Sequence, residues 1–417
     1  MKIDWLLSVK YLFSKRKDSF LSFITFASIG GVLTGVMALI VVLSVMGGFQ
    51  SEIKEKILGT NSHIVLLKFG GGINSYGSLI TKVTSVDEVT GISPFILNQV
   101  LLSSDSGVTG AILRGVEEKT VENTTKLGQY IEEGSLKNLD KIKKVRLEEG
   151  GSIDVPGIML GKELAKNLGV SIGDLMTVIS PTGSISPTGI SPKMRQFQVR
   201  GIFVSGMYDF DAGVAIMGLL SAQDFFDLGK SVTGLEISVK NVENAPETAK
   251  LIEKKIGFPY YTRDWAEMNY NLFSALKLEK TIMFIILILI IFVAAFNIAS
   301  TLVMMVMDKR KEIAILKTMG ATPGTIRRVF VLMGFIIGFT GIILGDILGF
   351  ILCEIVSKYQ FIKLPSEIYY ITTIPVQFDP LTVVIIDILA LFISVLAAFY
   401  PASKAVKIKP AEILRYQ

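Results

Sequence analysis

The residues that could do chemistry in this sequence are few and widely separated. Among 417 residues there is one histidine, His63, and one cysteine, Cys353, so no Cys/His nucleophile pair and no Cys/His zinc set can be assembled. Gly229-Lys230-Ser231 is similar to the end of a phosphate-binding loop, but the residue five positions earlier is Asp224 rather than glycine. We therefore expect no catalytic residue, metal or cofactor in this chain, and expect that it is not an enzyme.

Two carboxylic acids, Asp346 and Asp387, lie inside long apolar stretches. Such acids invite the hypothesis of a proton relay, because charge is costly within a membrane and usually serves a function there. Neither acid has a basic residue in its own stretch. We therefore favour the other interpretation, an interior acid that is capped or that reaches water.

Four apolar stretches must position everything else. Half of the residues are hydrophobic and the mean hydropathy is +0.54, which is too apolar for a soluble protein and too polar for a bundle of ten spans. Each stretch can cross a hydrocarbon core of ~30 Å as a helix. The predicted spans are 20–49, 281–307, 329–357 and 381–400.

Residues 50–280 separate the first two spans and have a different pattern. Short apolar runs with β-branched residues alternate with Gly and Pro, which is typical of a mixed α/β domain. Near its end, Asp264 and Glu267 predict a capping box at the start of one continuous helix from Trp265 to Met307. The first half of that helix would stand outside the membrane as a stalk.

The distribution of positive charge predicts the orientation. Segments 1–19, 308–328 and 401–417 together hold 15 Lys and Arg residues, whereas 354–380 holds two. By the positive-inside rule, both termini and the 308–328 loop are cytoplasmic, and 50–280 and the 358–380 loop lie on the other side. Residues 1–19 read as an interfacial helix, 401–417 as a cytoplasmic tail, and the basic excess indicates a membrane surface rather than nucleic acid.

The 308–328 loop contains a short amphipathic pattern. Ile313 and Leu316 fall at helical spacing, and Gly320 predicts the end of the helix. Such a helix can receive a partner protein. The alternative is a solvated basic connector with no further role.

The segment Ser180 to Pro192 is uncharged and contains Pro181, Pro187 and Pro192. A flexible loop is one interpretation. The other is an exposed arm that the prolines restrict in φ and so preform for binding.

Several motifs resemble a known family. EIAILKTMGAT, from Glu312 to Thr322, resembles the segment that docks on the ATPase in the FtsX and MacB class of ABC-transporter permeases. Four more segments, and with them nearly the whole chain, resemble the lipoprotein-releasing permeases of the LolC/LolE family. They are VVLSVMGGF at residue 41, GIFVSGMYDFD at 201, LFSALKLEKTIMFIILILIIFVAAFNIAS at 272 and KPAEILRY at 409.

The resemblance implies a fold and a set of sites. The fold is a polytopic α-helical membrane protein with four transmembrane helices and a large mixed α/β periplasmic domain, the MacB-like (type VII) architecture. Met46 and Phe49 match positions that line the lipid cavity, while packing between helices is the other interpretation of both. In the arm, Pro181, Pro192 and Arg195 match positions that engage the carrier LolA, with Pro187 between them. The implied ATPase-coupling residues are Arg310, Glu312, Ile313, Ala314, Leu316, Lys317 and Gly320.

The implied function is transport without catalysis in this chain. A permease in the inner membrane would take lipoproteins from the bilayer and pass them to a LolA-like periplasmic carrier, while a separate LolD-like ATPase binds ATP-Mg. A second permease subunit is required, in a homodimer or a LolC/LolE heterodimer, and the choice between the LolC and LolE roles stays open. The alternatives are FtsX-like signalling to a cell-wall hydrolase, which expects a smaller external domain, and MacB-like efflux, which expects a fused ATPase.

Overall fold

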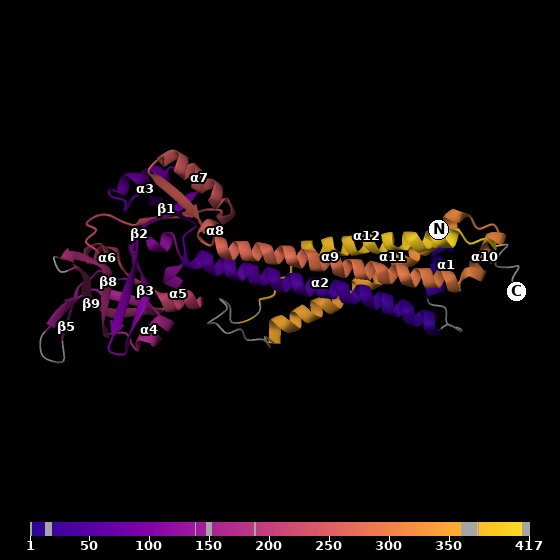
Figure 1. Cartoon of the computed structure of the whole chain (residues 1–417), viewed down its shortest axis with the longest axis horizontal. Helices are drawn as coiled ribbons and strands as arrows, with labels where there is room; N and C mark the ends of the chain where they lie inside the picture. Colours follow the sequence, from indigo (N-terminus) through magenta and orange to yellow (C-terminus); the bar gives the residue numbers. More distant parts are fainter. Residues whose placement is uncertain are drawn as a thin grey trace. The chain divides into compact units, whose positions relative to one another are not determined.

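The computed structural model describes residues 2–12, 19–137, 139–146, 152–186, 189–359, 373 and 375–410. It divides into two compact units (Figure 1). The membrane unit comprises Met1–Gln50, Ala275–Ile362 and Ile374–Gln417, and the α/β unit comprises Ser51–Ser274 and Lys363–Thr373. Most of the predicted 358–380 loop, the end of the 401–417 tail and residues 13–18 of the predicted interfacial helix lie outside the described residues.

Four helices of the membrane unit are long and apolar enough to cross a bilayer, which confirms the predicted number of spans. Two shorter helices, α1 and α10, accompany them. The bounds are α1 Lys2–Leu12, α2 Ser19–Thr60, α9 Tyr270–Asp308, α10 Arg310–Thr318, α11 Pro323–Tyr359 and α12 Pro380–Val406.

Glycines allow α11 to pack closely on two neighbours at once. A Cβ added at Gly338 would lie 2.6 Å from the Cβ of Ser394 on α12, and one added at Gly345 would lie 2.9 Å from the Cβ of Val36 on α2. Real side chains do not approach so closely, so both positions need the bare backbone. Gly334 and Gly338 face α12, and Gly341, Gly345 and Gly349 face α2.

The first two spans also pack on each other. Gly31 of α2 lies against Asn297 of α9, whose Nδ2 would be 2.8 Å from an added Cβ. One turn earlier, the hydroxyls of Ser28 and Thr301 form a hydrogen bond of 2.5 Å. Within a bilayer no hydrophobic driving force brings helices together, because lipid tails are as apolar as the side chains. Interhelical hydrogen bonds of this kind therefore add to van der Waals packing in holding the helices together.

The α/β unit is built on one ten-stranded sheet, which confirms the predicted mixed α/β fold. The strand order is β12-β1-β11-β2-β3-β10-β7-β9-β4, with β8 paired to β2 and β9, and β5 with β6 form a separate ribbon. The strands are β1 Ile64–Lys68, β2 Val89–Ser104, β3 Gly107–Val116, β4 Ile131–Gly134, β5 Lys143–Arg146, β6 Ser152–Val155, β7 Gly157–Gly161, β8 Leu175–Ser186, β9 Gly189–Phe203, β10 Val214–Gly218, β11 Gly234–Val239 and β12 Tyr260–Asp264.

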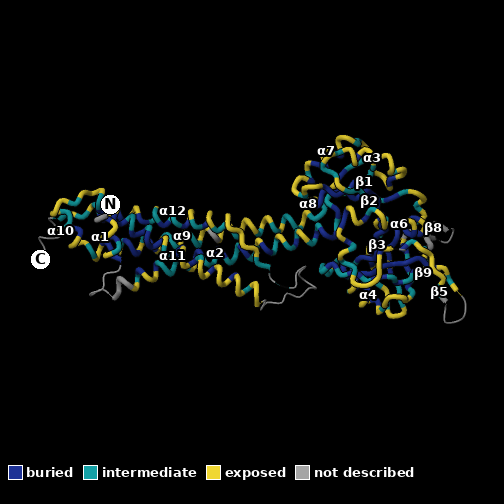
Figure 2. The backbone as a smooth tube through the Cα atoms, turned by 180° about the vertical axis from the view of Figure 1, so that it is seen from behind, coloured by how far each residue is buried: buried dark blue, intermediate teal, exposed yellow. Residues whose placement is uncertain are grey.

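Both faces of the sheet are covered. In β10, Ala215 and Met217 join the larger hydrophobic core, whereas Val214 and Ile216 join a smaller core on the other face, as the two-residue period of a strand requires. Buried residues accordingly run through the middle of this unit in Figure 2. The helices of the unit are α3 Gly77–Thr84, α4 Lys162–Leu168, α5 Tyr208–Gly213, α6 Leu219–Phe225, α7 Ala245–Ile256 and α8 Trp265–Met268.

The predicted continuous helix from Trp265 to Met307 is wrong in one respect. The side chain of Asp264 does cap a helix, because its Oδ1 accepts hydrogen bonds from the backbone of Ala266 and Glu267. That helix, however, is the single turn α8, and Asn269 interrupts it before α9 begins. The Asn269 side chain donates to the carbonyl of Trp265 (2.8 Å), so a local polar bond competes with helix propagation there.

Candidate functional sites

The helix α10 occupies the segment that the sequence predicts to be amphipathic. It ends in a Schellman motif: the Ala321 N–H donates to the carbonyl of Leu316 (2.9 Å) and the Gly320 N–H to that of Lys317 (3.1 Å). Gly320 has φ +96°, a left-handed conformation that glycine adopts without strain. The role of Gly320 is therefore to end α10 in this conformation.

The inner face of α10 holds the helix on the membrane unit. Ile313 and Ala314 are fully buried, and Leu316 is half-buried against the same core. The ammonium of Lys317 donates to the carbonyl of Val406 (2.5 Å), the last residue of α12, and to that of Ile408 (2.7 Å), two residues further on. These four predicted coupling residues fix the position of α10 and are not a free surface.

The outer face of α10 is the part that a partner can reach. Arg310 and Glu312 are exposed, and so are two apolar residues that sequence reasoning missed, Ile315 (48% exposed) and Met319 (78%). The signal that could have found Ile315 is its position two residues after the buried Ile313, which places it on the opposite side of the helix. Met319 follows Ile315 by four residues, about one turn, and so lies on the same side. The structure thus divides the predicted coupling residues into those that attach α10 to the membrane unit and those that are exposed to a partner.

Glu312 also links α10 to α1. Its carboxylate accepts a hydrogen bond from the hydroxyl of Tyr11 and pairs with Lys309 (3.1 Å). Burial, the negative charge of Glu312 and this hydrogen bond raise the pKa of Tyr11 to about 12, so the phenol remains a donor at all physiological pH values.

The predicted arm is a β-hairpin rather than a flexible loop. It is the extension of β8 and β9 beyond the sheet, with Ser184 opposite Ser191 and Ser186 opposite Gly189. Pro181 and Pro192, at its base, are exposed. Pro187 lies outside the described residues.

The base of the hairpin is attached to the loop and helix beneath it. Arg195 forms an ion pair with Asp224 (2.5 Å) and lies over the ring of Phe197, and Lys193 pairs with Asp227 (2.7 Å). The guanidinium of Arg195 is therefore already engaged within the chain, which its sequence position alone did not reveal.

Met46 and Phe49, predicted for the lipid cavity, lie one turn apart near the boundary of the membrane unit. Both are half-buried on α2. Between them Gly48 packs against the backbone of Pro375, and the Gln377 N–H donates to the carbonyl of Ser44 (3.0 Å). Other described residues line the three best-formed cavities.

The two membrane acids are partners of each other. A hydrogen bond joins the carboxyl groups of Asp346 on α11 and Asp387 on α12. The remaining Oδ1 atoms of both side chains are buried without a partner among the described residues. A capped interior acid, the favoured interpretation, is what this geometry resembles, although the cap comes from the neighbouring span.

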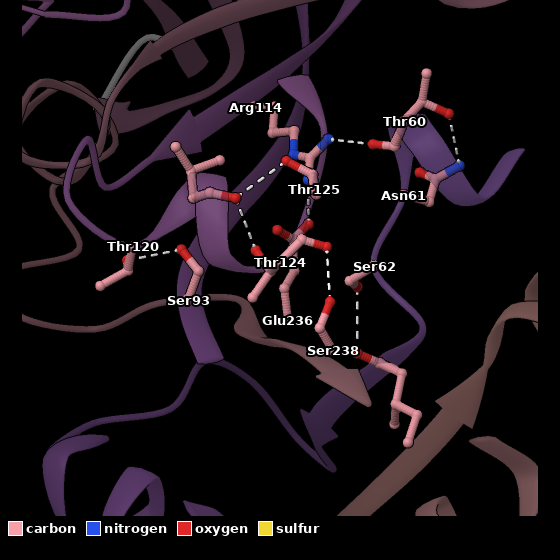
Figure 3. Close-up of polar contacts among 12 residues, drawn as sticks. Thr60, Asn61, Ser62, Ser93, Arg114, Thr120, Thr124, Thr125, Glu236 and Ser238 are labelled. Atoms are coloured by element: carbon pink, nitrogen blue, oxygen red, sulfur yellow. Dashed lines mark hydrogen bonds and ion pairs between the residues drawn. The ribbon is translucent and has the colours of Figure 1, made fainter. Parts of the chain in front are cut away.

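The end of α2 is clamped by a buried ion pair that sequence reasoning missed (Figure 3). Arg114 of β3 donates to the carbonyl of Thr60 (3.0 Å), the last residue of α2, and to Oε1 of Glu236 on β11 (2.5 Å). Both side chains of the pair are more than nine-tenths buried. A cation at a helix C-terminus satisfies carbonyls that have no partner within the helix. An arginine among the apolar residues and glycines of Ala111–Val116 was the available signal.

Two further polar residues have structural roles. His63 is half-buried and accepts a hydrogen bond at Nδ1 from the Val239 N–H (3.0 Å), and burial lowers its pKa. Asp211, in the GIFVSGMYDFD motif, is buried and accepts bonds from the Ser205 N–H and hydroxyl and from the Gly206 N–H. Burial raises the pKa of the Asp211 carboxyl group. Its hydrogen bonds to Ser205 and Gly206 stabilise the turn after β9. No cluster of potential metal ligands occurs among the described residues.

Comparison with known proteins adds family information to this geometry. Residues 25–255 match the MacB-like periplasmic core domain, and residues 284–410 match the FtsX-like permease C-terminal domain. Among solved structures, the periplasmic region of MacB from Actinobacillus actinomycetemcomitans is similar at 10% identity and a TM-score of 0.30, covering 52% of this chain and 94% of that structure.

Three full-length relatives are informative. The lipoprotein-releasing system transmembrane protein LolC of Xylella fastidiosa is 35% identical over 99% of this chain and 98% of that protein. LolC of Neisseria meningitidis is 34% identical with the same coverage. LolE of Haemophilus influenzae is 29% identical over 99% of both chains.

Proposed function

We infer that this chain, which belongs to the LolC/LolE family of lipoprotein-releasing system transmembrane proteins, is the permease subunit of an ATP-driven transporter that releases lipoproteins from the inner membrane. The observation that carries this inference is the full-length similarity to lipoprotein-releasing proteins at up to 35% identity. The FtsX-like and MacB-like matches describe the architecture shared by a wider superfamily, and do not by themselves favour signalling or efflux.

We propose that both termini and α10 face the cytoplasm and that the α/β unit is periplasmic. The charge distribution along the sequence supports this orientation. ATP would be bound by a separate LolD-like subunit seated on the outer face of α10, and this chain would have no catalytic role of its own. A LolA-like carrier would receive the lipoprotein on the periplasmic side.

We propose that two permease subunits form the path for the lipid. Four spans are too few to enclose acyl chains, and α9 exposes large apolar side chains, including Phe284, Leu289 and Phe296. A homodimer or a LolC/LolE heterodimer would cover this helix. Relatives of both LolC and LolE type extend over the full chain, so similarity alone does not divide the two roles.

Proteoliposomes that contain the permease, its ATPase and a triacylated lipoprotein test this function. We expect ATP-dependent transfer of the lipoprotein to added carrier, and no transfer when ATP or the carrier is omitted.

Photocrosslinkers at Met46 and Phe49 should then capture acyl chains, because both side chains are half-buried near the end of the first span. Crosslinks only to other helices would assign both residues to packing, and ATP-dependent extrusion of a small drug without lipoprotein release would favour efflux.

The hairpin at residues 181–192 is our proposed docking element for the carrier. Deleting residues 182–191 should abolish carrier binding in calorimetry without lowering the melting temperature, because the ion pairs of Lys193 and Arg195 below the hairpin are retained. Arg195→Gln should weaken binding if the guanidinium contacts the carrier, whereas Asp224→Asn, which frees the same guanidinium, should not. Full carrier binding by the deletion variant would place docking elsewhere in the α/β unit.

A further inference from the structure

A groove of about 1220 Å³ lies on the membrane unit, between α1, the first turns of α11 and the end of α12. We propose that it is a binding site for one anionic phospholipid, with the acyl chains on its apolar lining and the headgroup phosphate on its cations. The apolar lining includes Leu6, Val331 and Phe399. The cations are Lys10, Arg327 and Arg328.

The first argument is that α1 forms a fixed wall of this groove. The Ser8 hydroxyl donates to the carbonyl of Val329 on α11 (3.0 Å), and Tyr11 and Leu12 are buried against the membrane unit. Leu6 (64% exposed) projects from the opposite side of the helix, and Trp5 (50%) projects from the edge of the attached face. A helix attached along one face, with large apolar residues on the other, presents those residues to the bilayer interface.

The second argument is charge. Lys10, Arg327 and Arg328 are exposed, and none of the three forms an ion pair with a described residue of the chain. Of the lining residues, Asp4 alone is acidic, and it is 6% exposed and already engaged in a polar contact. Three free cations beside one occupied acid select an anionic headgroup.

The combination decides the chemical class of the ligand. A soluble anion would satisfy the cations but leave Trp5, Leu6 and Phe399 uncovered, whereas a purely apolar chain would leave three positive charges without partners. A zwitterionic phospholipid brings a cation of its own to the basic cluster. An anionic phospholipid satisfies both requirements. This inference goes beyond the proposed transport and requires only that α1 lies at a membrane surface.

Tryptophan fluorescence can test the site in the full-length chain. The sequence has two tryptophans, Trp5 and Trp265, and Trp265 is buried in the α/β unit. A Trp5→Phe variant gives the fluorescence of Trp265 alone, and its difference from the unaltered chain is the signal of Trp5. The protein is reconstituted in phosphatidylcholine vesicles with the same small fraction of dibrominated phosphatidylglycerol or dibrominated phosphatidylcholine. We expect the anionic lipid to quench Trp5 with an apparent affinity on the order of fivefold higher.

Two variants identify the groove as the source of that preference. Arg327→Gln with Arg328→Gln should bring the two lipids to equal quenching while both still quench, because the apolar lining is retained. Lys407→Gln, which removes an exposed cation at the end of α12 outside the groove lining, should leave the preference unchanged. Equal quenching by both lipids in the unaltered chain, or a preference that survives the double substitution, would refute the proposal. Absence of quenching by either lipid would also refute it, since the groove would then be covered by protein.

Discussion

Reversing the charge of Glu312 and placing a carboxylate at Ile315 will reduce lipoprotein release in proteoliposomes by at least about tenfold, equivalent to ~1.4 kcal/mol of lost association with the ATPase. Both residues are on the exposed face of α10, so Glu312→Lys and Ile315→Asp alter what a partner contacts. The buried Ile313 and Ala314 are left intact, so α10 stays attached to the membrane unit. ATPase association by co-purification and release of lipoprotein to the carrier are the two measurements.

Two controls separate docking from folding in this experiment. Glu354→Lys is the same charge reversal at an exposed site near the other end of α11, and it should leave ATPase association unchanged. Tyr11→Phe removes the hydrogen bond to Glu312 but keeps the outer face of α10, so it should retain release. A Tyr11→Phe variant as defective as Glu312→Lys would show that Glu312 acts by holding α1, and the docking assignment would fail.

Replacing Arg114 by leucine will destabilise the α/β unit by roughly 3–5 kcal/mol, because it leaves the carboxylate of Glu236 buried without its counter-charge. The substitution also leaves the carbonyl of Thr60 without its donor. Urea unfolding followed at Trp265, in a Trp5→Phe background, should therefore show a transition at a much lower urea concentration.

The double substitution Arg114→Met with Glu236→Leu provides the decisive comparison. It removes both buried charges at once, so most of the stability lost in Arg114→Leu should return. Lys162→Ala, which breaks the exposed pair with Glu132 in the same unit, should leave the transition where it is. A double variant no more stable than Arg114→Leu would mean that the bond to Thr60, rather than charge pairing, accounts for the clamp.

The sequence predicts those features of the fold that depend on local pattern. Uncharged runs that are long enough to cross a bilayer as a helix can be recognised from the local sequence alone. The same is true of Gly320 at a helix end and of the cap residue Asp264. Features that need a distant partner were not predictable. Nothing within its own strand shows that Arg114 meets Glu236, because their pairing depends on the order of strands in the sheet.

The candidate sites divide along the same line. The coupling segment and the arm were located because their residues are contiguous, yet their exposed and buried members could not be separated without α12 and α6 in place. Asp346 had no visible partner because Asp387 is on another span. The break at Asn269 was missed because an amide that bonds back to the preceding turn carries no signal in hydrophobic periodicity.

The two glycine faces of α11 have a consequence for how the protein is made. Val32, Val36 and Ile40 of α2 leave the ribosome early, but the glycines that receive them, Gly341 to Gly349, are synthesised only after residues Ser51–Ser274 of the α/β unit. α11 in turn needs α12, the last span, before Gly334 and Gly338 are covered. During biogenesis the first span must therefore wait in the bilayer with its packing face unsatisfied, a state in which membrane chaperones or a second nascent copy can engage it.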